Sequence, residues 1–480
     1  MALLRHSGIY FLARILAGGA SFAVISAYTR LLDPHAFGEY ALSLAGVAFF
    51  SGLIVYGPML AMLRYLPSHS QAARATTLWG LTLPACAICG VAIVVILLAA
   101  PGRWQLQLVL CAALLIATLL HQFQLATAQG ALEPGRYALL GSLESALDML
   151  VGIGLVALGY GVPGALLGTT LATVAAVAVN WRSWWINWKF FDPVLGQQML
   201  RFCLPLVATA LFGWLGTFGD RWLLGLYVGA NQAGLYSASY DLQMNMLGVP
   251  LAVMQLAGYP LAISALSEHG VTAARQQLRL LGAFLILFVL PEAVGIVMTG
   301  PLLVNIFLGA EFRPLALSLL PVLVSVTVLK ALISYVINGY FLAARTGRTL
   351  LSIVAAAVID IVLNLILIPH YGVWGSAMAA LVASGAGLAV AVILMRGVFA
   401  FPLPDPVILI GGLLGVAAMA AWLSPFYLVT AWSALFYVIP VAVLVYFGAV
   451  FLVLHLAGRK PLDLMLSSWN GGEAGRKAAL

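Results

Sequence analysis

The sequence predicts an all-α polytopic membrane protein of about 14 transmembrane helices, built as two parallel six-helix repeat lobes plus two C-terminal helices. Three observations lead to this fold class. The 480 residues are 63% hydrophobic and only 8% charged, whereas soluble domains carry about 25% charged residues. The apolar residues fall into runs long enough to cross about 30 Å of hydrocarbon. The second half of the chain also repeats features of the first half.

Short polar breaks separate the apolar runs, and each run is long enough to form one membrane-spanning helix. The predicted spans are residues 8–31, 41–63, 76–100, 105–130, 137–159, 163–181, 200–227, 237–266, 279–301, 315–341, 348–369, 373–396, 405–425 and 429–457. The shortest turns between neighbouring spans are expected near Gly161 and His370.

The basic residues give the orientation. Most of the 22 Lys and Arg residues fall in loops on the side that holds both termini. Basic residues concentrate in cytoplasmic loops of membrane proteins, so we expect both termini in the cytoplasm. The net charge of +7 does not indicate nucleic acid, because these residues are scattered through short loops.

An internal repeat relates the two halves. The matching features are Gly135-Arg136 and Gly347-Arg348, Asp148 and Asp360, and the YGV triplets at 160–162 and 371–373. A weaker match relates Phe37–Tyr40 to Ala233–Tyr236. The repeat unit contains six helices, an even number, so both copies share one orientation, as in transporters with parallel repeats.

These features define the expected domain organisation. The N-lobe covers residues 1–181 and the C-lobe covers residues 200–396. Between them, residues 182–199 form an aromatic linker, whose tryptophans suit the membrane interface. Residues 397–457 hold helices 13 and 14, and residues 458–480 form a cytoplasmic tail.

Charged side chains inside predicted spans are the candidate functional residues, because a charge at mid-membrane costs about 2.5–3.5 kcal/mol. The candidates for contact with substrate in a polar cavity are Arg14, Arg30, Asp220, Arg221, Asp241 and Lys330. The candidates for proton or ion coupling are Asp220, Glu144, Asp148 and Asp360. Arginine suits an anionic headgroup because its planar fork binds two phosphate oxygens at once.

Each candidate also has a structural alternative. Arg14 and Arg30 could extend their charges to the two membrane interfaces. Asp220 and Arg221 could form an ion pair at a helix end, and Asp148 and Asp360 could be structural hydrogen-bonding groups.

We expect neither a metal nor a cofactor. Cys86 and Cys89 form a CxxC pattern, but they lie in an apolar run, where cysteines are usually small core residues.

Three stretches resemble a known family. They are residues 30–40, which end in "FGEY", residues 205–240 and residues 359–384. They resemble polysaccharide flippases of the multidrug/oligosaccharidyl-lipid/polysaccharide (MOP) exporter superfamily. The resemblance implies a bacterial inner-membrane protein that moves an undecaprenyl-pyrophosphate-linked oligosaccharide from the cytoplasmic to the periplasmic leaflet, for O-antigen or exopolysaccharide biosynthesis.

The resemblance also implies a mechanism and partners. Two lobes would alternate access, with ion or proton coupling, around a cavity lined chiefly by helices 1, 2, 7 and 8. Arg14, Arg30, Asp220 and Asp241 lie on those helices, whereas Lys330 does not. The expected partners are the lipid-linked glycan, membrane lipids, and polymerase and chain-length proteins of the same pathway.

Other functions predict different sequence features. A drug or cation exporter of the same superfamily would favour an acidic cavity, whereas the first helix here contributes arginine. A peptidoglycan-precursor flippase would have nearly the same physical features as a glycan flippase. A membrane-embedded glycan polymerase or ligase would need catalytic groups at the periplasmic face, usually on a long loop, and no such loop is expected. A channel would not need a two-lobe repeat with kinked helices. We therefore expect a transporter and no enzymatic activity.

Overall fold

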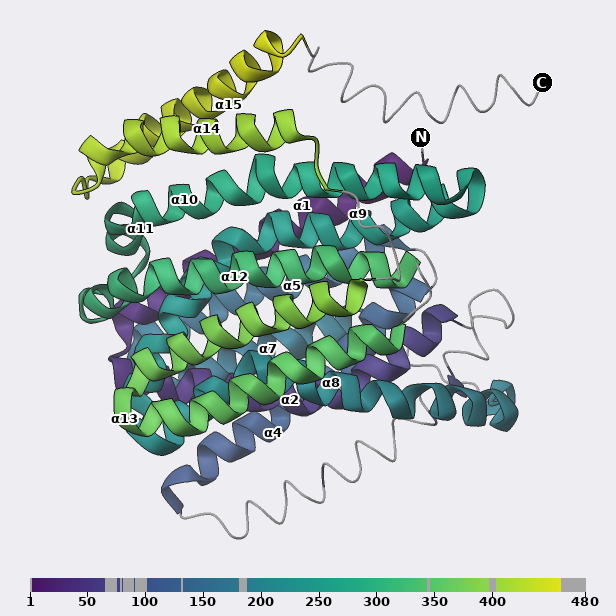
Figure 1. The fold of residues 1–480 in the computed structure, drawn as a ribbon. Coiled ribbons are helices and arrows are strands. Elements are labelled where there is room, and N and C mark those ends of the chain that lie inside the picture. Colours follow the sequence, from purple (N-terminus) through teal and green to yellow (C-terminus); the bar gives the residue numbers. More distant parts are fainter. Residues whose placement is uncertain are drawn as a thin grey trace. The chain divides into compact units, whose positions relative to one another are not determined.

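A computed structural model describes residues 2–64, 102–130, 133–180, 188–342, 346–396 and 403–458, together with Thr76, Thr77, Gly80 and Gly90. The regular elements in this part of the chain are helices, drawn in Figure 1. The chain divides into two compact units. The first unit comprises Met1–Asp241, Leu308–Phe312 and Ala357–Ala379, and the second comprises Leu242–Phe307, Arg313–Ala356 and Ala380–Leu480.

The first unit contains the N-terminal helices. They are α1 (Ala2–Leu31), α2 (Pro34–Arg64), α4 (Gly102–Gly130), α5 (Pro134–Leu147), η1 (Asp148–Gly152), α6 (Ile153–Leu155), η2 (Val156–Tyr160), α7 (Gly161–Val179), η4 (Trp188–Phe190) and α8 (Pro193–Val228). The beginning of α9 (Ala230–Phe284), the short turn η6 (Ala310–Phe312) and the middle of α13 (Thr346–Met395) also belong to this unit.

The second unit contains most of the C-terminal helices. After α9 they are η5 (Leu285–Val289), α10 (Leu290–Met298), α11 (Gly300–Phe307), α12 (Arg313–Leu342), α14 (Pro406–Leu423), η7 (Ser424–Phe426), η8 (Trp432–Phe436) and α15 (Val438–Leu456). Its core joins Leu278, Leu285 and Val289 to Leu320 and Val324 of α12. The helices α14 and α15 pack side by side as a hairpin (Figure 1).

The predicted fold class is confirmed as an all-α polytopic membrane protein. Among the described residues, 8 stretches are long and apolar enough to cross a membrane. Two of them, Gly135–Val179 and Leu350–Met395, each contain two predicted spans. The predicted span 76–100 lies largely outside the described residues, so the count of about fourteen stays a prediction, as do the lobe boundaries.

The two shortest predicted turns have the same backbone geometry. Gly161 has φ 55° and ψ −140°, and Gly372 has φ 55° and ψ −129°. Glycine is the residue that adopts this conformation readily, because it has no Cβ. The tyrosine before each glycine is exposed, at 62% for Tyr160 and 67% for Tyr371. The repeated YGV triplets therefore form equivalent turns.

The weaker repeat match also has a structural counterpart within the first unit. Gly38 of α2 lies against the beginning of α9, where an added Cβ would overlap the carbonyl oxygen of Ala230. Gly234 of α9 lies against the beginning of α2, where an added Cβ would overlap the carbonyl oxygen of Pro34. The two repeat-related glycines thus pack against each other, and each fits against the other's helix.

Several helix boundaries differ from those predicted. Helix α8 begins at Pro193 instead of residue 200, because Asp192 caps it by accepting hydrogen bonds from the backbone N–H groups of Val194 and Leu195. The helix predicted at 279–301 begins directly after Gly270, whose φ of 81° breaks α9. The last helix begins at Val438 instead of residue 429, which places Pro440 in its first turn, where proline is tolerated.

The helices α2 and α8 pack closely along their length. An added Cβ at Gly52 would overlap the ring of Trp214. Gly57 lies against Cys203, with 3.1 Å between an added Cβ and the cysteine Cβ. The rings of Phe49 and Trp222 are in edge-to-face contact at 4.9 Å between centroids. Small residues thus let this helix pair approach closely, as is typical of membrane helices.

Candidate functional site

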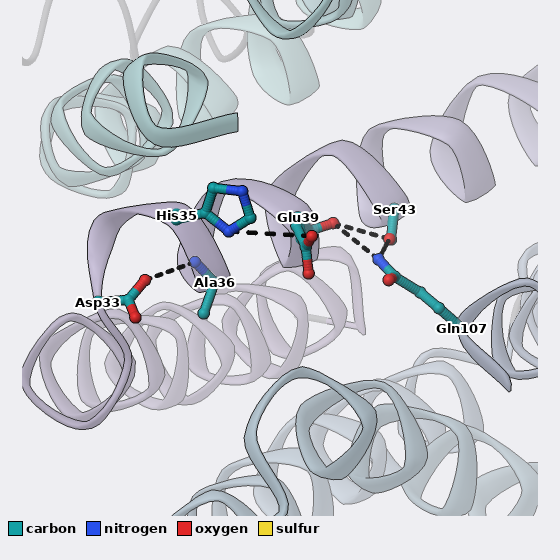
Figure 2. Close-up of polar contacts among 6 residues, drawn as sticks. All are labelled: Asp33, His35, Ala36, Glu39, Ser43 and Gln107. Atoms are coloured by element: carbon teal, nitrogen blue, oxygen red, sulfur yellow. Dashed lines mark hydrogen bonds and ion pairs between the residues drawn. The ribbon is translucent and has the colours of Figure 1, made fainter. Parts of the chain in front are cut away.

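The turn between α1 and α2 is held by local hydrogen bonds (Figure 2). The Asp33 carboxylate accepts from the backbone N–H of Ala36 at 2.8 Å and so caps α2. Further along, Gln107 of α4 donates to the Ser43 hydroxyl at 2.8 Å, which fixes α4 against α2. The contacts that Figure 2 draws around Asp33 are those of a structural turn.

Arg30 is exposed and folds back onto its own helix. Its guanidinium donates to the Ser26 carbonyl at 2.7 Å and also to the Ser26 hydroxyl. This places the positive charge at the C-terminal end of α1, where a cation interacts favourably with the helix dipole.

A charged cluster lies where α8 meets α9, and we call it the α8/α9 charged cluster. It consists of Asp220, Arg221, Tyr236, Tyr240 and Asp241. The Arg221 guanidinium donates to the Asp241 carboxylate at 2.6 Å, and the arginine side chain is only 8% exposed. The same guanidinium lies over the Tyr240 ring, at 5.1 Å from its centroid. The ion pair therefore joins the two helices.

The Asp220 carboxylate forms no salt bridge with the guanidinium of Arg221, which pairs with Asp241. Its carboxylate accepts the backbone N–H of Arg221 at 2.8 Å and the hydroxyl of Tyr236 at 2.6 Å. Asp220 and Tyr236 are both buried. The structure thus brings together the predicted site residues Asp220, Arg221 and Asp241. Their ion pair joins α8 to α9, and it is not the pair of Asp220 with Arg221 at the end of one helix.

A second group of polar side chains lies among α4, α5 and α7, and we call it the α4/α5/α7 polar cluster. It consists of His121, Glu144, Asp148, Thr169 and Thr173. The Glu144 carboxylate lies 3.1 Å from His121 Nδ1 and accepts the Thr173 hydroxyl at 2.9 Å. Asp148, one turn further along, lies close to Thr169. Glu144 and Asp148 share one helix face, as their spacing predicts.

The remaining predicted site residues are Asp360, Lys330 and Arg14. Asp360 is buried on α13, and its backbone carbonyl accepts the side-chain amide of Asn364 at 2.9 Å. Lys330 is half-buried on α12 in the second unit. Arg14 lies on α1, and its side chain is outside the described part of the structure.

Five residues of the two clusters are not predicted from the sequence, namely His121, Thr169, Thr173, Tyr236 and Tyr240. His121 and Tyr236 contact predicted residues from other helices, and spacing along one chain segment does not reveal such contacts. Asn364 contacts a predicted residue one turn away on its own helix. The signal for His121 was available, because "HQFQ" at 121–124 places three polar side chains inside an apolar run. Among the described residues, no group of three or more His, Cys, Asp or Glu residues is placed to hold a metal ion.

The two clusters differ in what they can do chemically. In the α8/α9 charged cluster, the carboxylate of Asp241 balances the positive charge of Arg221. This cluster is therefore better suited to holding two helices together than to binding an anion. The α4/α5/α7 polar cluster has two carboxylates and a single histidine, so it can change its charge by gaining or losing a proton.

The sequence matches one family model. The model of the polysaccharide biosynthesis protein family matches residues 3–267, which is more than half of the chain. No curated protein sequence gives a significant match.

Solved structures with the same fold are transporters. The "Lipid II flippase MurJ, inward closed conformation" has a TM-score of 0.71 at 12% identity, covering 95% of this chain and 100% of that chain. An inward-facing multidrug resistance MATE family transporter of the MOP superfamily has a TM-score of 0.58 at 17% identity, covering 81% and 98%. A MOP superfamily transporter from Pyrococcus furiosus has a TM-score of 0.59 at 18% identity, covering 82% and 96%.

Proposed function

Because the chain belongs to the polysaccharide biosynthesis protein family and has the fold of MOP superfamily transporters, we propose that it is a lipid-linked oligosaccharide flippase. It moves an undecaprenyl-pyrophosphate-linked oligosaccharide from the cytoplasmic to the periplasmic leaflet of a bacterial inner membrane. The observation that carries this proposal is the family match over residues 3–267. The glycan serves surface polysaccharide synthesis, and polymerase and chain-length proteins of that pathway are its partners.

Transport proceeds by alternating access between the two repeat lobes. The close contact of Gly38 with Gly234 supports this mechanism, because it joins the first hairpins of the two repeats without intervening side chains. Small residues at such a crossing allow one helix to roll on another, since no side chains have to disengage.

Arg14 and Arg30 of α1 contact the pyrophosphate. Arg221 is a weaker candidate, because its guanidinium already pairs with Asp241. Arg30 lies exposed at the end of α1, and its guanidinium contacts include atoms of Ser26 on its own helix, which phosphate oxygens can replace as acceptors. Arg14 lies on the same helix, in the interior of the predicted span.

Ion or proton movement drives the cycle. Moving one elementary charge through 100 mV supplies about 2.3 kcal/mol, enough to bias a two-state cycle. The candidate coupling groups are the carboxylates Asp220, Glu144, Asp148 and Asp360, three of which have the protein contacts described above.

A reconstitution experiment tests the proposed function. The purified protein is placed in liposomes with an undecaprenyl-pyrophosphate oligosaccharide, and a membrane-impermeant lectin reports how much glycan reaches the outer face. We expect protein-dependent exposure of the glycan. The same assay with lipid II, and a drug-uptake assay, test the two rival transporters. Exposure of lipid II alone, or drug uptake without glycan movement, would contradict the proposal.

The arginine contact is tested in the same assay. Arg14→Ala is expected to abolish glycan exposure while the protein still inserts, because the pyrophosphate loses its bidentate partner. Arg136→Ala is the matched control, because Arg136 pairs with Glu133 at 2.9 Å near a helix start, outside the proposed cavity. Equal activity of both variants would rule out the role of Arg14.

A further inference from the structure

We infer that the α4/α5/α7 polar cluster is a proton-binding site in which His121 accepts the proton and Glu144 stabilises it. The binding of the proton follows from the geometry of the cluster. Only the use of that proton to drive transport rests on the proposed function.

The position of His121 is the first step of the argument. The side chain is 1% exposed, and its Nδ1 lies 3.1 Å from Glu144 Oε2. A neutral imidazole has one N–H donor and one acceptor nitrogen. Since Nδ1 faces a carboxylate, it carries the hydrogen, and Nε2 is left with the lone pair. Nε2 is buried and has no hydrogen-bond partner among the described residues, so it is the atom to which a proton adds.

The charge balance of the cluster is the second step. With neutral His121 and both carboxyl groups ionised, the cluster carries two negative charges, on Glu144 and Asp148, one helical turn apart. Like charges that lie close together in a buried site favour uptake of a proton. Protonation of His121 turns its contact with Glu144 into an ion pair and leaves one negative charge on the cluster. Histidine is the side chain whose charge ordinarily changes between about pH 5 and pH 8.

The groups facing the cluster do not supply another cation in the described part of the chain. Helix α4 packs against α2, α5 and α7. Glu144 of α5 and Asp148 of η1 belong to the cluster, whereas the Arg136 guanidinium of α5 pairs with Glu133 two turns before Glu144. Tyr28 of α1 and Tyr40 of α2 lie close to Asp148. Helix α7 presents only the hydroxyls of Thr169 and Thr173, since its sequence contains no ionisable side chain.

The helix geometry at the cluster is the third step. The fifth predicted span changes from α-helix to π-helix at Asp148 and does so again at Val156. Single π-helical turns inside helices occur frequently at functional sites. Gly152, inside the first π-turn, has no space for a Cβ, which would overlap the hydroxyl of Tyr28. Gly168 of α7 lies equally close to Gly152. The helices α1 and α7 therefore both approach η1 closely, one turn beyond Asp148.

A direct measurement tests the proton-binding site without transport. The chain has 7 histidines, so histidine-selective isotope labelling gives a small set of NMR signals in nanodiscs, and the signal lost in His121→Gln is that of His121. We expect this signal to change as the pH is lowered and the midpoint of that change to move in Glu144→Gln. A signal that stays constant as the pH is lowered, or a midpoint unchanged by Glu144→Gln, would overturn the inference.

The use of the proton is tested in glycan-loaded liposomes with an imposed pH gradient. The wild type is expected to respond to the gradient, and His121→Gln is expected to lose that response while it still moves glycan. His370→Gln is the matched control, because His370 is an exposed histidine on α13. A His121→Gln variant that keeps the wild-type response would overturn the coupling role. A wild type that moves no glycan at all would instead contradict the proposed function, and the NMR titration would still decide on proton binding.

Discussion

At the scale of single residues, the partner of a charge determines what that charge can do. Arg221 and Arg30 are both arginines at or near the ends of predicted spans. The guanidinium of Arg221 is buried against Asp241 and the Tyr240 ring, whereas that of Arg30 is exposed and contacts its own helix. A buried ion pair is costly to break, because the remaining charge is left without a partner.

The α8/α9 ion pair therefore has a measurable effect on stability. Asp241→Ala leaves the buried Arg221 guanidinium without its acceptor and is expected to lower the free energy of unfolding by about 1–3 kcal/mol. The measurement is thermal unfolding of the purified protein in detergent. His35→Ala is the control, because His35 is 62% exposed and lies 3.9 Å from Glu39, and such surface pairs contribute little. Equal unfolding temperatures for both variants would show that the pair is not structural.

At the scale of helices, glycines set the places where elements turn and cross. Gly161 and Gly372 provide the two tight turns, and Gly38 and Gly234 provide the crossing of α2 with α9. All four positions require a residue without a Cβ. Gly161 and Gly372 require it because of their positive φ, and Gly38 and Gly234 require it because a Cβ would overlap the facing backbone.

The turn glycines can be tested as a pair. Gly161→Ala and Gly372→Ala each force a side chain into a conformation that costs of order 1–3 kcal/mol, so both are expected to lower thermal stability by similar amounts. Gly154→Ala is the control, because an added Cβ there meets nothing within 4 Å and its φ is ordinary. A large difference between the two turn variants would contradict the equivalence of the repeats.

The crossing glycines are expected to be more sensitive still. Gly38→Ala and Gly234→Ala place a Cβ on a backbone carbonyl oxygen, and overpacking of this kind typically costs about 1–3 kcal/mol or more. Thermal unfolding and glycan exposure in liposomes are the measurements. Gly46→Ala on α2 has space for its Cβ and is expected to behave like the wild type. Wild-type stability of Gly38→Ala would show that the two helices separate there without cost.

Much of the element scale could be predicted from the sequence, because apolar length decides where a chain crosses a membrane. The sequence predicts the two YGV turns near Gly161 and near His370, and the turn glycines are Gly161 and Gly372. The start of α8 was predicted at the wrong residue. Asp192 caps this helix through hydrogen bonds to backbone N–H groups, and hydropathy carries no information about such bonds. The polar clusters were predicted only in part. Glu144 and Asp148 share a helix and could be paired by spacing, whereas His121 reaches Glu144 from another helix.

At the scale of the whole molecule, the distribution of basic residues predicts the topology. A fluorescent protein fused after residue 458 is expected to fluoresce and alkaline phosphatase fused there to be inactive, because the distribution of basic residues predicts a cytoplasmic tail. The same reporters fused at residue 430, between α14 and α15, are expected to give the opposite result. Active phosphatase after residue 458 would invert the predicted orientation.

The contact between Gly38 and Gly234 has a consequence for the origin of the chain. Each glycine meets the other's helix in the same way: Gly38 at the carbonyl of Ala230 and Gly234 at the carbonyl of Pro34. Reciprocal contacts of this kind are the mark of a two-fold axis between identical subunits. A six-helix ancestor that dimerised through this glycine would have made the contact already. Joining two copies of its gene end to end would then preserve the contact, with no new interface to evolve.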